Sequence, residues 1–327
     1  MEWPPASVVL VVRLGRCELQ VFPLCLGGNV FGWTADEQQS FAVLDAYLAA
    51  GGNFIDTADS YSAFAPGNQG GESETVLGNW FSVRGNREQV VLATKVGKMP
   101  GVQGLAPDTI RTGVENSLRR LRTDYIDLYW AHADDPNTPL ADTLRTFDEL
   151  IKAGKVRHIG ASNYSAARLE EALQVSDREG LARYITVQPE YSLVERDEYE
   201  GELAGLCERE GLSCVPYWAL ARGFLTGKYR AGVQIDSPRA GQASVYLDAR
   251  GLRVLAALDQ VAAAHDTTVA AAALAWVAAQ PAVAAPIASA RTTQQLDESL
   301  PMAELKLSSG ELAALREASA TERAAAG

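Results

Sequence analysis

Histidine and cysteine are scarce in this sequence, and both shortages narrow its chemistry. The 327 residues include three histidines, none of them in an H-x-H pattern, so a metal-dependent barrel hydrolase has little support and we expect no metal site. We assign no role to His158 or His265. The four cysteines form no CxxC pair and no zinc spacing, which favours a reduced, cytoplasmic protein.

Positive charge and long apolar runs are also in short supply. Lys and Arg number 29 against 41 Asp and Glu, and the formal net charge of −12 works against generic binding to nucleic acid or anionic membranes. The stretch from Met1 to Val12 has no basic region and only a five-residue apolar run, so it is not expected to be a signal peptide or an anchor. Gln280, Pro281 and Pro286 interrupt the Ala-rich region 269–288 below the length of a membrane-spanning helix. The sequence predicts neither a nucleic-acid nor a membrane partner.

Strand and helix signals alternate along most of the chain. Charged residues make up 21% and hydrophobic residues 47%, which is ordinary for a globular protein with a substantial core. Runs at 8–12 and 17–21 predict an amino-terminal β-hairpin that closes the bottom of a barrel. Eight strand–helix units follow, with strands expected at 24–27, 53–56, 90–95, 126–131, 156–162, 186–190, 213–217 and 284–288. Further helices are expected near the carboxy terminus, at 308–319 among others, and residues 320–327 are expected to fray.

This alternation predicts an α/β fold of the (β/α)8 TIM barrel type, with the hairpin in front and extra helices near the carboxy terminus. By length alone the chain allows two domains, but such barrels commonly run this long as one. We therefore expect a single domain over 1–327. Its working face should lie at the carboxyl ends of the strands.

Three consecutive predicted strands end in ionisable side chains. Asp56 ends one strand, Lys95 the next and His132 follows the third, while Tyr61 comes five residues after Asp56. Each has a plain structural interpretation by itself: an acid that caps a turn, a lysine that reaches water, a core histidine. Because the carboxyl ends of parallel strands meet at one rim, convergence on a common site is the more economical explanation.

With these residues the sequence resembles the aldo-keto reductases, whose catalytic tetrad of Asp, Tyr, Lys and His corresponds to Asp56, Tyr61, Lys95 and His132. The likeness extends from about residue 24 to residue 300, and the chain is identified as a bacterial member of the branch similar to potassium-channel β subunits. Carbonyl reduction needs a proton donor at the oxygen. We expect Tyr61 to be this general acid, with its pKa lowered by Lys95, and Lys95 held charged by Asp56. A neutral His132 would orient the carbonyl.

The resemblance also implies residues that bind NADPH (NADP+). They comprise Gly28, Asn29, Asp56, Ser162, Asn163, Gln188, Tyr217, Trp218, Ala219, Leu220, Arg222, Lys228, Ser289, Arg291, Gln295 and Glu298. Ser162, Asn163 and Gln188 would hold the nicotinamide carboxamide, and Tyr217 would stack on its ring. Lys228 would meet the pyrophosphate and Arg291 the adenosine 2′-phosphate, which favours NADPH over NADH.

The sequence departs from the family at this cofactor site. Trp218 and Ala219 stand where Ser and Pro are more common, Ser289 replaces a Gly, and Ser299 replaces an Asn. The missing Rossmann glycine fingerprint agrees with a cofactor bound on a barrel.

The sequence thus predicts an NADPH-dependent oxidoreductase that reduces an aldehyde, ketone or sugar-like carbonyl to an alcohol. The alternative is a catalytically weak NADP(H)-sensing binding protein or regulatory subunit. Trp33, Tyr61, Phe64 and Trp130 are expected to line an aromatic substrate pocket, completed by the loop 233–247. The substrate, the reaction direction and the oligomeric state stay open.

Overall fold

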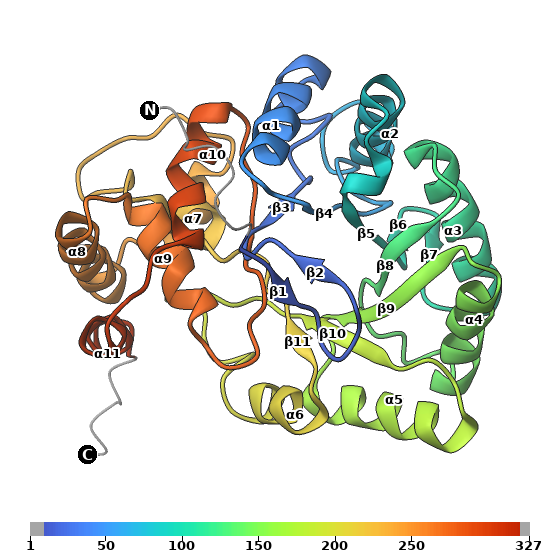
Figure 1. The fold of residues 1–327 in the computed structure, drawn as a ribbon. Helices are drawn as coiled ribbons and strands as arrows, with labels where there is room; N and C mark the ends of the chain where they lie inside the picture. Colours follow the sequence, from blue (N-terminus) through green and yellow to red (C-terminus); the bar gives the residue numbers. More distant parts are fainter. Residues whose placement is uncertain (1–9, 321–327) are drawn as a thin grey trace.

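Eight parallel strands form the centre of the molecule in the computed structural model, which describes residues 10–320 (Figure 1). The strands are hydrogen-bonded in the order β11-β10-β9-β8-β5-β4-β3-β12. Their bounds are β3 Cys25–Gly27, β4 Phe54–Asp56, β5 Val91–Val96, β8 Ile126–Ala131, β9 Val156–Ser162, β10 Tyr184–Gln188, β11 Ser213–Cys214 and β12 Ile287–Ala288. All residues of β8 are buried, as expected for a parallel strand that is covered on both faces.

The sheet closes on itself between β11 and the segment that leads into β12. The backbone N–H of Cys214 donates to the carbonyl oxygen of Ala282 at 2.7 Å, and the N–H of Ala284 donates to the carbonyl oxygen of Cys214 at 2.8 Å. The predicted (β/α)8 barrel is therefore confirmed. The expectation of a single domain stays a prediction.

Helices surround the barrel. They are α1 Glu37–Ala49, α2 Glu72–Arg84, α3 Pro107–Leu121, α4 Leu140–Lys152, α5 Ala166–Glu179, α6 Glu202–Glu210, α7 Ala240–Ala243, α8 Ala249–Ala264, α9 Val269–Ala278, α10 Thr293–Ser299 and α11 Ser309–Ala318. In α3, Pro107 begins the helix and Ile110, Val114, Leu118 and Leu121 are buried. The helix ends where Arg122 adopts a left-handed conformation.

Two local features differ from the sequence expectation. The sequence carries a capping-box pattern at Thr34 and Glu37 that predicts a helix start there, but the capping box of α1 is formed by Asp36 and Gln39. A small antiparallel hairpin, β6 Lys98–Met99 with β7 Val102–Gln103, follows β5 and was not predicted. The expected extra helices near the carboxy terminus are present. Among them, α8 and α11 pack on each other at the side of the barrel (Figure 1).

The amino-terminal hairpin closes one end of the barrel. It consists of β1 Val12–Arg13 and β2 Gln20–Val21. Side chains of this hairpin, among them Leu14 and Leu19, share one apolar cluster with the inward-facing residues Phe54 and Trp130. The predicted closure is confirmed for the described part, while residues 8 and 9 and the expected frayed end, 321–327, lie outside the described residues.

Within residues 10–320, no helix taken singly has the length and hydropathy of a membrane-spanning segment. Only α8 and α9 taken together are long and apolar enough, and the chain bends by 99° between them.

Candidate functional site

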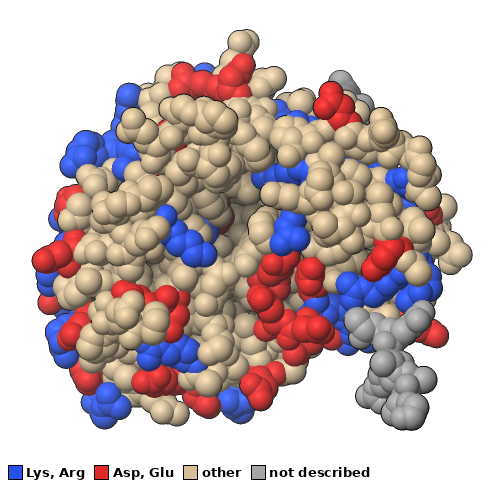
Figure 2. All heavy atoms as spheres, turned by 180° about the vertical axis from the view of Figure 1, so that it is seen from behind, with Lys and Arg blue, Asp and Glu red and all other residues tan. Residues whose placement is uncertain are grey.

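A cleft of about 1280 Å³ opens at the carboxyl ends of the strands, opposite the hairpin. Figure 2 shows this face, with a hollow near its centre and Lys and Arg side chains at its edge. Most of the residues predicted for the cofactor line this cleft: Asn29, Ser162, Asn163, Gln188, Tyr217, Trp218, Leu220, Arg222, Lys228, Ser289, Arg291, Gln295 and Glu298. Tyr61 and His132 line it as well.

The floor of the cleft holds a buried chain of hydrogen bonds around Lys95. Its Nζ donates to the Tyr61 phenolic oxygen at 2.7 Å and to the Thr57 carbonyl oxygen at 2.9 Å, and it forms an ion pair with the Asp56 carboxylate. The other carboxylate oxygen of Asp56 accepts a hydrogen bond from Gln188 Nε2 at 3.1 Å. The predicted Asp, Tyr and Lys therefore lie together, although they come from two strands and a loop. Asp56 lies beneath the cleft and does not line it.

Burial outweighs the lysine in setting the acidity of Tyr61. Removal of the phenol from water raises its pKa to about 12, although the neighbouring Lys95 acts in the opposite direction. The expected net lowering is therefore not found in the protein alone. For Lys95, burial favours the neutral amine, but Asp56 and Tyr61 more than compensate and raise its pKa. At neutral pH the pair is a protonated phenol beside an ammonium ion.

His132 is neutral and faces the same phenol. Burial holds its pKa well below the usual 6.5, and the charges of Lys95 and Lys98 lower it further. Its ring lies edge-on to that of Tyr61, with 6.1 Å between centroids. Nδ1 of His132 is buried without a hydrogen-bond partner. The fourth predicted residue thus lies beside the other three, with its imidazole able to donate one hydrogen bond.

Amide and hydroxyl groups at and just beyond the carboxyl ends of β9, β10 and β11 form one wall of the cleft. Asn163 Nδ2 donates to the His132 carbonyl oxygen at 2.8 Å and to Ser162 Oγ at 3.0 Å. The Tyr217 hydroxyl donates to Asn163 Oδ1 at 2.8 Å. Because both ends of its amide are bonded, Asn163 is held in one orientation despite its left-handed backbone, with φ of 57°.

The loop after β11 is tightly bent and pinned by Arg222. Trp218 and Arg222 both have positive φ, 51° and 56°, which is costly for residues with large side chains. The Arg222 guanidinium lies 3.8 Å from the Trp218 ring centroid and donates to the Tyr246 hydroxyl at 2.6 Å and to Glu190 at 3.3 Å. Ala219 is fully buried and does not line the cleft.

Three cations gather at the far end of the cleft. They are Lys228, Arg239 and Arg291, and within residues 10–320 none of their side chains forms an ion pair with a carboxylate. Burial lowers the pKa of Lys228 and of Arg239, and in both cases Arg291 lowers it further. Mutual repulsion of this kind makes the end of the cleft a strong site for an anion. Arg239 escaped the sequence reasoning because the loop 233–247 has no periodicity that would place it.

Glycine and serine shape the wall next to β12. A side chain on Gly27 would come within 2.6 Å of Ser289 Oγ, and Gly27, not the predicted Gly28, lines the cleft. Gly28 is buried, and its N–H donates to the Asp56 carbonyl oxygen at 2.7 Å. Ser289 Oγ donates to Asn29 Oδ1 at 2.7 Å, so the serine that replaces the common glycine has a partner.

Two of the expected aromatic residues stand at the cleft mouth, in addition to Tyr61. Trp33 and Phe64 pack edge to face with ring centroids 4.8 Å apart, and Phe64 is 61% exposed. Trp130 is fully buried in the barrel interior, where it packs over Gly160, so its expected place in the pocket wall is wrong. The Arg239 guanidinium lies 5.5 Å from the Trp33 ring centroid and joins the aromatic end of the cleft to its cationic end.

The sequence matches a model of the Aldo/keto reductase family over residues 23–320. It is 33% identical over 329 residues to the protein Tas of Escherichia coli strain K12, covering 92% of this chain and 95% of that protein. It is 33% identical over 312 residues to norsolorinic acid reductase stcV of Emericella nidulans, covering 90% and 77%. A probable voltage-gated potassium channel subunit beta of Oryza sativa subsp. japonica is 34% identical over 299 residues, covering 88% and 89%.

Proposed function

The chain belongs to the aldo/keto reductase family of oxidoreductases, and from this premise we propose that it uses NADPH to reduce an aldehyde, ketone or sugar-like carbonyl to an alcohol. One observation supports this above all. Lys95 joins the phenol of Tyr61 to the carboxylate of Asp56 at the floor of a cleft large enough for a dinucleotide and a small substrate. A protonated phenol held by an ammonium ion is a proton donor of the kind that carbonyl reduction requires.

The residues of the cleft fit a phosphorylated dinucleotide. Lys228, Arg239 and Arg291 form a cationic end in which, among residues 10–320, none of the three makes an ion pair with a carboxylate, although Glu298 lies near enough to act on the pKa of Lys228. Such an end suits phosphate groups: two cations can meet a pyrophosphate and the third a 2′-phosphate. Ser162, Asn163 and Gln188 offer hydrogen-bonding side chains near the tetrad, which suits a carboxamide. When bound, the cofactor supplies the hydride.

Tyr61 transfers its phenolic proton to the carbonyl oxygen of the substrate. The phenolate that remains is stabilised by the Lys95 ammonium, whose own charge is maintained by Asp56. His132, being neutral, donates a hydrogen bond to the same carbonyl oxygen and fixes its direction toward Tyr61. Asp56 and Lys95 are each only 1% exposed, so water does not compete for the bonds that hold the ammonium beneath the phenol.

The aromatic residues at the mouth give the site a preference for a flat, apolar substrate body. Trp33 and Phe64 present their ring surfaces beside Tyr61, and an aromatic aldehyde would bury its ring there while its carbonyl meets the tetrad.

A second function, binding of NADP(H) by a regulatory subunit with little turnover, is favoured by the likeness to the potassium channel subunit. The two are separated by measuring NADPH binding through protein fluorescence and NADPH oxidation with an aromatic aldehyde, an aliphatic aldehyde, a ketone and an aldose. Turnover with any of these supports the reductase. Tight binding without turnover across the panel supports the regulatory subunit, and a lack of binding overturns both.

A further inference from the structure

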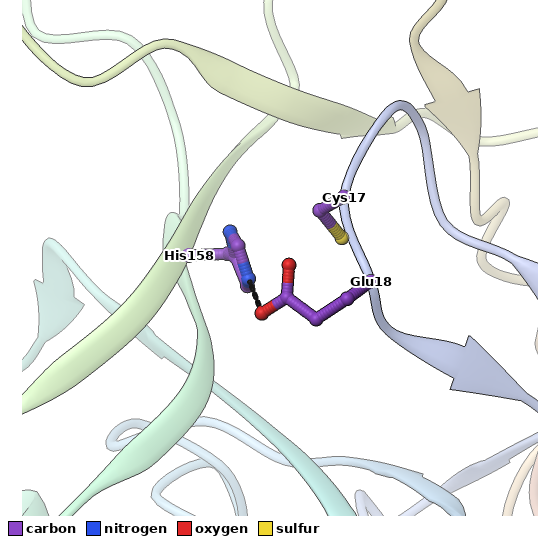
Figure 3. A group of neighbouring side chains, drawn as sticks. All are labelled: Cys17, Glu18 and His158. Carbon is purple, nitrogen blue, oxygen red and sulfur yellow. Dashed lines mark hydrogen bonds and ion pairs between the residues drawn. The ribbon is translucent and has the colours of Figure 1, made fainter.

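The closed end of the barrel carries a second group of chemically active side chains, on the opposite face from the cleft. Cys17 and Glu18 lie in the turn between β1 and β2, and His158 lies on β9. Their ligand atoms, one sulfur, one carboxylate oxygen and one imidazole nitrogen, all lie within 4.8 Å of one another (Figure 3). His158 Nε2 and Glu18 Oε1 are 3.0 Å apart.

The fold brings these three together for reasons unrelated to the cleft. Side chains alternate along β9, so His158 shares a face with Gly160 and Ser162 and lies in the first half of the strand, toward the end that the hairpin covers. The hairpin covers this end of the barrel and sets its turn against the strand.

The thiol is fixed and the carboxylate is adjustable. Cys17 Sγ donates to the Leu14 carbonyl oxygen at 3.1 Å and accepts the Leu19 N–H at 3.4 Å, and the residue is only 9% exposed. The Glu18 side chain is 78% exposed, whereas that of His158 is 19% exposed. A ligand would therefore bind first to the less exposed Cys17 and His158, and the exposed Glu18 carboxylate would then rotate to contact it.

Sulfur, imidazole nitrogen and carboxylate oxygen are the ligand set of Zn²⁺. Bonds of about 2.0–2.3 Å in a tetrahedral site place ligand atoms about 3.3–3.8 Å apart. The Cys17 sulfur, which lies within 4.8 Å of the other two ligand atoms, would approach them by at most roughly 1 Å, while His158 Nε2 and Glu18 Oε1, now 3.0 Å apart, would separate slightly. Rotation of the exposed Glu18 side chain adjusts the carboxylate. Loss of the thiol proton removes the bond that Cys17 donates to the Leu14 carbonyl oxygen, which lets the sulfur move toward His158.

The surrounding charges are compatible with a cation without favouring it. Arg157 is engaged by the Asp127 carboxylate at 2.8 Å. The Arg13 guanidinium donates to the carbonyl oxygens of Arg16 and Cys17. Arg13 and Arg157 both keep their positive charge and repel a bound cation. We therefore expect the affinity for a divalent cation to be moderate and not very high.

We propose that Cys17, Glu18 and His158 form a three-ligand site for Zn²⁺ or a similar thiophilic divalent cation, with water in the fourth position. The sequence alone predicts no metal site and gives His158 no role. Cys17 and His158 are far apart in the chain, and neither lies at a zinc-ligand spacing from another cysteine or histidine. On binding, the Cys17 thiol loses its proton to solvent and a sulfur–metal bond replaces the S–H bond. The Leu19 N–H continues to donate to the sulfur and stabilises the thiolate.

The bound cation would join the hairpin to β9. Since it binds only when the hairpin is seated on the barrel, it would stabilise the folded chain by mass action. This effect is independent of NADPH and of turnover.

The test uses the purified full-length chain, stripped of metal and kept reduced. Co²⁺ is titrated as a spectroscopic substitute, because a thiolate ligand gives an intense charge-transfer band, and Zn²⁺ stoichiometry is measured by competition with a chromophoric chelator. The variants are Cys17→Ser, Glu18→Gln and His158→Gln. The control is His265→Gln, whose ring contacts Glu311 at 2.8 Å in a comparable His–Glu pair but with no cysteine in the group.

We expect one equivalent of Zn²⁺ per chain and a charge-transfer band in the wild type and in His265→Gln. We expect affinity at least about tenfold lower in His158→Gln and Glu18→Gln, and no band in Cys17→Ser. Zn²⁺ should raise the Tm of the wild type and the control by more than that of His158→Gln. The proposal is overturned when the wild type does not bind one equivalent of Zn²⁺. It is also overturned when Glu18→Gln and His158→Gln both bind Zn²⁺ with the affinity of the wild type. Those two variants decide the matter even when Cys17→Ser does not fold.

Discussion

The Lys95 ammonium lies 2.7 Å from the phenolic oxygen of Tyr61 and donates a hydrogen bond to it. Its remaining two donors are taken by the Asp56 carboxylate and the Thr57 carbonyl oxygen. A lysine has three donors, so each one is satisfied although the side chain is only 1% exposed. Full satisfaction is what allows a buried ammonium to persist, and it fixes the positive charge beside the phenol.

The ion pair between Asp56 and Lys95 should behave as one unit in stability. Lys95→Met leaves a buried carboxylate without its cation, and Asp56→Asn leaves a buried ammonium without its anion, so each should cost about 3–5 kcal/mol. The double variant, which leaves no isolated charge, should be far less destabilised than the sum. Urea denaturation of the four proteins measures this, and strictly additive losses would contradict the pairing.

His132 should not titrate in the physiological range. Because its pKa lies well below 6.5, the ring is neutral throughout, and kcat/KM for carbonyl reduction should show no inflection from it between about pH 6 and 8. His132→Leu, which has no donor, should lower the rate by about 100-fold through loss of the hydrogen bond to the carbonyl oxygen. An inflection near pH 6.5 that disappears in His132→Leu would show instead that the ring acts in its charged form.

Arg291 should separate NADPH from NADH. Its removal in Arg291→Ala deletes one charge-assisted bond to the 2′-phosphate, worth about 1.5–3 kcal/mol, so the Kd for NADPH should rise roughly 10-fold to 100-fold while that for NADH stays the same. Fluorescence titration with both cofactors measures this. Arg230→Ala is the matched control, since Arg230 does not line the cleft and pairs with Asp259 at 2.7 Å. Equal losses for NADH would mean that Arg291 meets a group common to both cofactors.

The buried carboxyl of Asp59 should make stability fall as pH rises. Burial raises its pKa from 3.8 to about 7, and Glu74 adds to the effect. The folded chain therefore holds a proton that the unfolded chain has released between these values, so the free energy of unfolding decreases from about pH 4 to about pH 7.

Asp59→Asn should remove this part of the pH dependence. The fully exposed Asp108 provides the control in Asp108→Asn. Urea denaturation at pH 5 and pH 8 compares the three proteins. An unchanged dependence in Asp59→Asn would show that another group carries it.

Much of this site could be predicted from the sequence because strand periodicity is local. Asp56, Lys95 and His132 each end an apolar strand or directly follow one, and parallel strands deliver such residues to one rim whatever the details of packing. The closing hairpin was predictable in the same way, from two short apolar runs around a Gly-containing turn.

The remainder depends on contacts between distant segments. The net rise in the pKa of Tyr61 results from burial, which the sequence near Tyr61 does not encode. Arg222 is a partner of Glu190 and Tyr246, which come from separate segments, so its side-chain bonds could not be foreseen. Trp130 follows the expected strand alternation but fills the space over Gly160 inside the barrel rather than the cleft wall.

The most direct measurement is the single-turnover rate of aromatic aldehyde reduction by Tyr61→Phe saturated with NADPH. Tyr164→Phe, which changes a buried tyrosine outside the cleft, is the control. We predict a fall of at least about 100-fold for Tyr61→Phe, with an unchanged Kd for NADPH and a wild-type rate in the control. Equal rates for Tyr61→Phe and wild type would contradict the assignment of Tyr61 as the proton donor.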